Sequence, residues 1–135
     1  MSDQTITSLI EKLEGAEVGS RELDVSLAWN SWVEPKLWAS TTSKGVTVWK
    51  VERQGKRVPL PNYTTSLDAA LSLAERVLTM GAWDVGYTYN SDRPHYARLV
   101  IVRDDEGQPE IYGRAATPAL ALCAAILRAQ SEARV

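Results

Sequence analysis

The feature that most constrains the fold is an uninterrupted apolar run from Pro118 to Leu127. Apart from the thiol of Cys123, none of its side chains is polar or charged. Thr117 can cap a helix that has Pro118 at its first position, so the run predicts a helix that is apolar on every side. Such a helix has to be buried. Because the run is about half as long as a membrane-spanning helix, we expect it in the core of a soluble domain.

Length and charge limit what this domain is and what it binds. A chain of 135 residues can bury one core but is short for two domains. We expect a single domain over 1–135, with helices over 1–33, an irregular region containing a strand over 34–62, and a core over 63–135. The formal net charge of -2 offers no basic face, which argues against RNA or DNA as a partner. The sequence starts without a basic and then apolar leader, so we expect a cytoplasmic location and no membrane contact.

Hydrophobic periodicity and turn residues predict the individual elements. The expected helices are about 4–15, one capped by Ser20, about 66–80, and one starting at Pro118. The expected strands are one around Trp49, 83–89, 95–103 and 109–113, with turns at 54–56 and 104–107.

Three antiparallel strands between two helices determine how those helices run. Because the number of strands is odd, the helix over 66–80 and the last helix lie parallel along the sheet, with both N-termini at the same end. If both cover one face, the caps at Thr65–Ser66 and at Thr117 are neighbours, and the two N-terminal helices cover the other face. The expected fold is α+β, a three-layer α/β/α sandwich around an antiparallel sheet of three to four strands.

Three stretches of the chain together resemble one protein family. They are Gly19–Asp24 (GSRELD), Tyr63–Leu71 (YTTSLDAAL) and Ala116–Ala125 (ATPALALCAA). In order and spacing they are similar to small phage-encoded proteins grouped as the phage ABA-sandwich domain family. The resemblance implies an α/β/α fold and a gene that acts inside a bacterial host, where many small phage proteins counter host defence. It implies no activity, since fold does not determine function.

The residue types that usually carry catalysis are scarce in this sequence. His95 and Cys123 are the only residues of their kinds, so no zinc cluster is expected. His95 stands in no recognisable motif with a nucleophile, and an apolar setting makes the Cys123 thiol unreactive. The acidic run 104–106 suits a turn better than a metal site. We therefore expect no enzyme, no metal and no cofactor.

The N-terminal ends of two parallel helices could bind an anion, because they present unpaired N–H groups and positive dipole ends. Arg114 precedes the second cap by three residues and could reach the same place. Each helix end contributes only ~0.3–1 kcal/mol and an arginine bond roughly 1.5–3 kcal/mol, against about 12 kcal/mol for nanomolar binding. The alternative to an anion site is that the two caps serve only their own helices and that Arg114 is solvated. The predicted ligand-binding residues are Trp38, Tyr63, Thr64, Thr65, Ser66, Arg114 and Thr117.

These features leave three hypotheses for function. The first is a non-enzymatic anti-defence protein that sequesters a phosphate-bearing, nucleotide-derived signal. The second is a protein without a small-molecule ligand, either an interaction protein that blocks a host or phage protein through Trp29, Trp32 and Trp38 or a structural accessory protein. The third, double-stranded RNA binding, follows from the order of the elements but lacks a lysine cluster. A homo-oligomer is also expected, because the apolar last helix has more surface than one sheet face can cover; burial within the monomer is the alternative.

Overall fold

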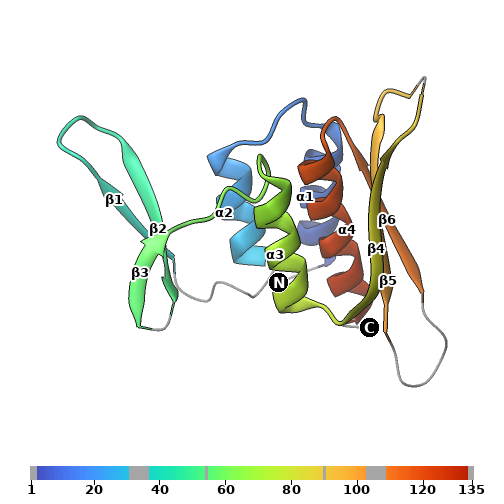
Figure 1. The fold of residues 1–135 in the computed structure, drawn as a ribbon. Coiled ribbons are helices and arrows are strands. Elements are labelled where there is room, and N and C mark those ends of the chain that lie inside the picture. The colour runs from blue at the N-terminus through green and yellow to red at the C-terminus, as the bar shows by residue number, and fades with distance from the viewer. Residues whose placement is uncertain (1–2, 31–36, 54, 90, 103–108, 134–135) are drawn as a thin grey trace.

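The computed structural model describes residues 3–30, 37–53, 55–89, 91–102 and 109–133. Within these residues it contains four helices and two three-stranded antiparallel sheets (Figure 1). The helices are α1 (Asp3–Gly15), α2 (Arg21–Asn30), α3 (Leu67–Val77) and α4 (Pro118–Ala133). The first sheet has the order β1 (Leu37–Thr41), β2 (Thr47–Arg53), β3 (Lys56–Pro59), and the second has the order β4 (Met80–Tyr87), β5 (His95–Ile101), β6 (Glu110–Ala115).

All four helices lie on one side of the β4–β5–β6 sheet (Figure 1). α4 packs on β5 and β6, α1 packs on α4 beside β6, and α3 packs on α4 from the other direction. The small β1–β2–β3 sheet lies beyond the helices, at the far side of the molecule (Figure 1). Along β6, buried Ile111, Gly113 and Ala115 alternate with exposed Glu110, Tyr112 and Arg114. The β4–β5–β6 sheet therefore has one face against the helices, which we call the inner face, and an outer face that none of the four described helices covers.

The α+β class, the antiparallel sheet and the C-terminal order of helix, three strands and helix are confirmed. The order of the layers differs from the expected sandwich, in which the N-terminal helices cover the opposite face of the sheet. α4 explains the difference. It is buried continuously from Ala119 to Leu127, and one sheet face can cover only one of its sides, so α1 and α3 cover the others.

Close backbone contact fixes α4 on the sheet. Gly113 in β6 has no room for a side chain, because a Cβ there would lie 2.1 Å from the carbonyl oxygen of Ala121. On its far side, the thiol of Cys123 donates to the carbonyl oxygen of Tyr63 at 3.3 Å. The apolar run is thus buried within one chain, between the sheet, α1, α3 and the segment that leads into α3.

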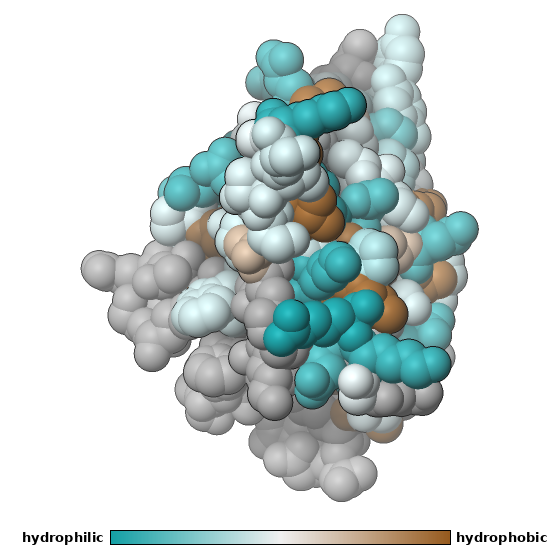
Figure 2. Space-filling view, turned by 90° about the vertical axis from the view of Figure 1, so that its left-hand side faces the viewer, coloured by the Kyte–Doolittle hydropathy of each residue, from teal (hydrophilic) through white to brown (hydrophobic). Residues whose placement is uncertain are grey.

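The region expected to hold one strand forms a three-stranded sheet instead. Gly45 (φ 81°) and Gly55 (φ 79°) adopt backbone angles that favour glycine and lie between consecutive strands. Val51 in β2 is fully buried and joins this sheet to the core. Figure 2 views the molecule from this side and shows hydrophobic residues as small separate patches among hydrophilic ones. Gln54 and the predicted turn at 104–107 lie outside the described residues.

Candidate functional site

The caps of α3 and α4 form as the sequence indicates and lie close together. The Ser66 hydroxyl accepts a hydrogen bond from the Ala69 N–H, and the Thr117 hydroxyl accepts one from the Leu120 N–H, both at 3.2 Å. One shallow hollow of about 280 Å³ includes both helix starts. Its lining residues are Val18, Gly19, Thr64, Thr65, Leu67, Thr117, Pro118 and Ala119. Parallel α3 and α4 therefore do bring their N-termini to one place.

Thr64 stabilises the fold and is not available to a ligand. It is fully buried, and both its hydroxyl (2.6 Å) and its backbone N–H (2.8 Å) donate to Asp24 Oδ1. Its hydroxyl also accepts from the Ser20 N–H at 3.0 Å. Gly19 permits this approach, because a Cβ there would lie 2.1 Å from the Thr64 carbonyl oxygen. The stretches Gly19–Asp24 and Tyr63–Leu71 thus form one structural junction between α2 and the segment before α3.

The other residues predicted near this end differ in exposure. Tyr63 is buried in the core, with only 1% of its surface exposed, so its ring is not available as a stacking platform. Thr65 is exposed, and its hydroxyl lies 3.5 Å from the Asn62 carbonyl oxygen. Trp38 pairs with Lys50 in the β1–β2 ladder, but its side chain lies outside the described residues.

Arg114 does not join the helix caps, which corrects the predicted site. It lies in β6 between buried Gly113 and Ala115, so its side chain points to the outer face. Only its backbone faces the helices, where its N–H donates to Glu14 Oε2 at 3.0 Å. Sequence distance alone suggested proximity to Thr117, but strand alternation sends the guanidinium through the opposite face of the sheet.

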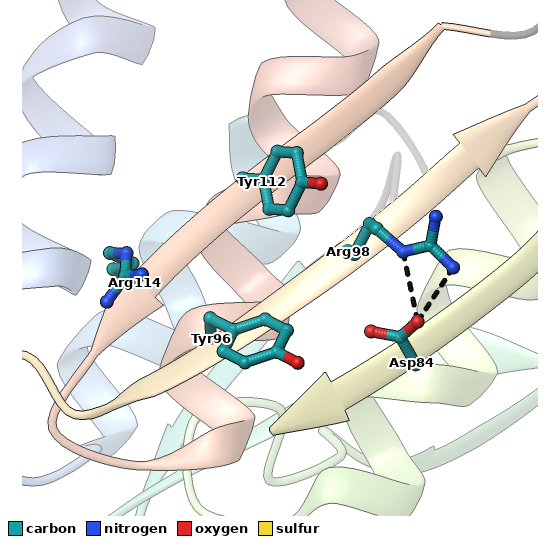
Figure 3. Close-up of a pocket in the computed structure, with 5 residues that line it drawn as sticks. All are labelled: Asp84, Tyr96, Arg98, Tyr112 and Arg114. Carbon is teal, nitrogen blue, oxygen red and sulfur yellow. Dashed lines mark hydrogen bonds and ion pairs between the residues drawn. The ribbon is translucent and has the colours of Figure 1, made fainter. Parts of the chain in front are cut away.

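On the outer face Arg114 belongs to a different cluster, shown in Figure 3. A depression of about 320 Å³ is lined by Asp84, Tyr96, Arg98, Tyr112 and Arg114. These residues come from all three strands and follow one face by the two-residue period of a strand. The pairs Tyr96/Arg98 and Tyr112/Arg114 were readable in the sequence. The expected sandwich covers this face with the N-terminal helices, and for that reason the sequence does not predict the cluster.

The two arginines of this cluster are not equivalent. Arg98 bonds to Asp84 Oδ2 through Nε (2.9 Å) and Nη2 (2.8 Å), and through Nη1 to Glu110. These hydrogen bonds raise the pKa of Arg98 and neutralise it with two carboxylates. No such contact is found for the Arg114 guanidinium within the part of the chain that the structure describes. Arg114 is therefore the cation of this face that can take an anionic ligand.

The two tyrosines give the depression flat aromatic surface beside that cation. The Tyr96 ring lies across Gly86, where a Cβ would come within 2.5 Å of its ring atoms and hydroxyl. Tyr112 is 48% exposed, and its hydroxyl donates to Glu110 Oε2 at 3.4 Å. Figure 3 shows both rings and both arginines on the same face of the sheet. Aromatic rings beside a guanidinium suit a planar ligand that carries an anionic group.

The residues considered for catalysis stay apart from this cluster. His95 contacts the Tyr87 ring edge to face on the inner side, with 5.2 Å between ring centroids. Burial, and after it the charge of Asp24, raises the pKa of the Cys123 thiol. No cluster of three metal-ligating side chains occurs among the described residues. In the same residues, no helix has the length and apolar character to cross a membrane. The acidic run 104–106 lies outside them.

Comparisons with protein-family models, with curated proteins and with solved structures found no match. The resemblance to the phage ABA-sandwich domain family stays a prediction.

Proposed function

We propose that this protein binds a small, phosphate-bearing, nucleotide-type ligand on the outer face of the β4–β5–β6 sheet and performs no chemistry on it. The observation that carries the proposal is the position of Arg114 beside two tyrosines in one depression. A base stacks on tyrosine rings, and a guanidinium binds phosphate through paired N–H groups. The proposed ligand site thus moves from the helix caps to the outer face.

The charges of this face favour a small ligand over a nucleic acid strand. Asp84 and Glu110 offset Arg98, which leaves Arg114 to meet an anion. Proteins that track a nucleic acid backbone neutralise several phosphates in a row. Among the described residues of this face, Arg114 is the one cation without a carboxylate partner, which matches one phosphate group, so RNA and DNA are not part of the proposal.

Magnitudes set the expected affinity. Each stacked base contributes about 1–3 kcal/mol and the charge-assisted arginine bond about 1.5–3 kcal/mol. Even with both tyrosines stacked, the binding free energy that one chain offers is close to the roughly 8 kcal/mol of micromolar binding and below the roughly 12 kcal/mol of nanomolar binding. A single chain is therefore expected to bind mononucleotides in the micromolar range or more weakly.

The test is titration calorimetry with a panel of mononucleotides and cyclic dinucleotides, using three variants. Arg114→Ala should weaken binding about tenfold to a hundredfold, because it removes the phosphate contact. Tyr96→Leu should weaken it less. Thr65→Ala, which changes the hollow at the helix caps, is the control and should bind as the wild type does. If Thr65→Ala loses binding while Arg114→Ala does not, the helix caps are the site and the outer-face proposal fails.

A sequestering role inside a bacterial host belongs to the same proposal. It is supported by the resemblance to small phage proteins and by the scarcity of catalytic groups among the described residues. Sequestration requires that the ligand leaves unchanged. Recovery of intact nucleotide after prolonged incubation supports the role, and conversion to a product contradicts it.

A protein-blocking role is the second candidate, and the specific observation in its favour is Trp29. Its side chain is 61% exposed on α2, and a large exposed aromatic side chain is a typical interface anchor. Trp32 and the side chain of Trp38, the other predicted anchors, lie outside the described residues. Loss of a captured host protein in Trp29→Ala but not in Arg114→Ala would favour this role.

A further inference from the structure

The two edges of the β4–β5–β6 sheet differ in whether their outward backbone groups have hydrogen-bond partners. At the β6 edge, outward backbone groups find partners on the helices: the Arg114 N–H donates to Glu14, and the Tyr112 carbonyl accepts from Arg128 Nη1 at 2.9 Å. Arg128 in turn bonds to both carboxylate oxygens of Glu14. This edge is closed by side chains of the same chain, as proteins often do to prevent edge pairing.

At the β4 edge the corresponding groups face outward. The Ile101 N–H donates to the Pro109 carbonyl. Because the direction of backbone hydrogen bonds alternates along a strand, the odd-numbered residues of β5 are the ones bonded to β6. Even-numbered β5 residues such as Arg98 are then bonded to β4, through partners such as Asp84. The backbone groups of the odd-numbered residues Trp83, Val85 and Tyr87 point away from the sheet. Figure 1 shows no described segment lying along this edge.

The side chains of the same three residues form an apolar strip on the inner face. α4 lies over β5 and β6 and hardly reaches β4. As a result Trp83 is 40% exposed and Tyr87 is 63% exposed. Tyr87 is held by its ring contact with His95. Among the described residues no partner is found for these outward backbone groups, so the edge combines free hydrogen-bonding groups with oriented aromatic side chains, two features that favour the addition of a strand.

We propose that this edge pairs with β4 of a second copy of the chain, antiparallel about a two-fold axis at Val85. In this register Val85 lies opposite Val85 of the partner subunit, and Trp83 lies opposite Tyr87 of the partner subunit. All three outward-facing residues then take the hydrogen-bonded positions of an antiparallel ladder. The aromatic side chains meet in cross-strand pairs on the inner face, and pairs of this kind stabilise sheets.

Charge on the outer face favours this register and a copy of the same chain. An axis at Asp84 would place two carboxylates opposite each other, whereas the axis at Val85 places Asp84 opposite Gly86 of the partner subunit. The Tyr96 ring lies over Gly86, and its hydroxyl oxygen is 2.5 Å from the position that a Cβ of residue 86 would take. Arg98 uses only Oδ2 of Asp84, so Oδ1 is left to accept from the Tyr96 hydroxyl across the axis. β4 thus supplies the acceptor and β5 the donor, so one chain carries both halves of the contact.

This dimer would join two three-stranded sheets into one six-stranded sheet with a continuous outer face. Both ligand depressions then lie on that face, related by the two-fold axis, and each has Asp84 of the partner subunit at its border. The dimer does not rest on the nucleotide proposal, because its evidence is the backbone and the inner face of β4.

The first test is the solution mass of the intact protein by light scattering. The wild type should have the mass of a dimer, and Val85→Pro should be a monomer with an unchanged circular dichroism spectrum. Proline is tolerated at an edge position whose N–H faces outward, so this change removes the pairing and preserves the fold. A wild type that stays monomeric at the highest soluble concentration would overturn the proposal.

Disulfide trapping tests the register and does not depend on how Val85→Pro folds. Opposed residues in a hydrogen-bonded pair have Cα atoms about 5.5 Å apart, within the roughly 4.4–6.8 Å that a disulfide spans. Val85→Cys should therefore cross-link rapidly under mild oxidation. Ala82→Cys, exposed on the same strand, is the matched control, because the two copies would lie about 20 Å apart. Equal cross-linking of both variants, or of neither, would contradict the proposed register.

Discussion

Polar groups on the two sides of the β4–β5–β6 sheet have opposite surroundings. On the inner side, Thr64, Asp24 and Glu14 are buried and bonded to other parts of the same chain. On the outer side, Arg114 is exposed beside two tyrosine rings. A buried polar group stabilises the fold only while its partners are present, whereas an exposed one is available to a ligand. The inner polar groups should therefore govern stability, and the outer ones should govern binding.

The largest expected effect is on the inner side, at Asp24. Asp24→Ala leaves the buried N–H and hydroxyl of Thr64 without their acceptor, so it should lower the free energy of unfolding by about 2–4 kcal/mol. Chemical denaturation measures this. Asp24→Asn is the matched control, because Oδ1 alone accepts both bonds, and it should lose clearly less. Equal losses would mean that the charge of Asp24, and not these hydrogen bonds, stabilises the junction.

Two glycines of the same sheet provide the next comparison. Gly113→Ala places a Cβ against the α4 backbone, which cannot move aside, and should cost about 1–3 kcal/mol of stability. The three heavy atoms nearest to a Cβ at Gly86 all belong to the end of the Tyr96 side chain, which can rotate, so Gly86→Ala should change stability by less than about 0.5 kcal/mol. It should instead weaken nucleotide binding by displacing the ring. If the stability losses were equal, the outer face would be as tightly packed as the inner one.

The smallest effect is the pH dependence at Glu14. Burial alone would raise its pKa, but bonds from Arg128 and the Arg114 N–H, with the charges of Arg128 and Arg93, hold it below the usual 4.5. A lowered pKa stabilises the fold above pH 4.5 and loses that contribution as the pH falls through the folded value. Melting temperatures should therefore converge between wild type and Glu14→Gln on acidification.

Glu11→Gln, on the exposed side of α1, is the control for this comparison and should follow the wild type at every pH. A constant difference between wild type and Glu14→Gln across the acid range would show that Glu14 acts by packing and not by its charge.

Local signals in the sequence predicted the four helices and the strands β4, β5 and β6, but only one of the three strands of the β1–β2–β3 sheet. Ser66 and Thr117 are hydroxyl residues before apolar helices, and both cap as expected because this contact depends only on neighbouring residues. The odd number of strands correctly placed both helix starts at one end. What local pattern could not determine is which face of the sheet each helix covers, since an amphipathic helix such as α1 can pack on a sheet or on another helix.

That limit explains the misplaced site. Arg114 is near Thr117 in the chain, but the two-residue alternation of β6 separates them across the sheet. Thr64 was expected to face a ligand, yet it is bonded to Asp24, a residue far away in sequence. Pairings of this kind depend on the tertiary fold and have no signature in the residues around either partner.

The position of α4 also has a consequence for how the protein is made. Every other element of the β4–β5–β6 layer and its helical cover precedes α4 in the chain, yet α4 is the helix on which α1, α3 and the sheet all pack. During synthesis these elements emerge from the ribosome before α4, so the apolar surfaces that pack on α4 stay uncovered until α4 follows. Folding of the core is therefore expected to be a late, concerted event, and the nascent chain is expected to need protection from aggregation until α4 has emerged.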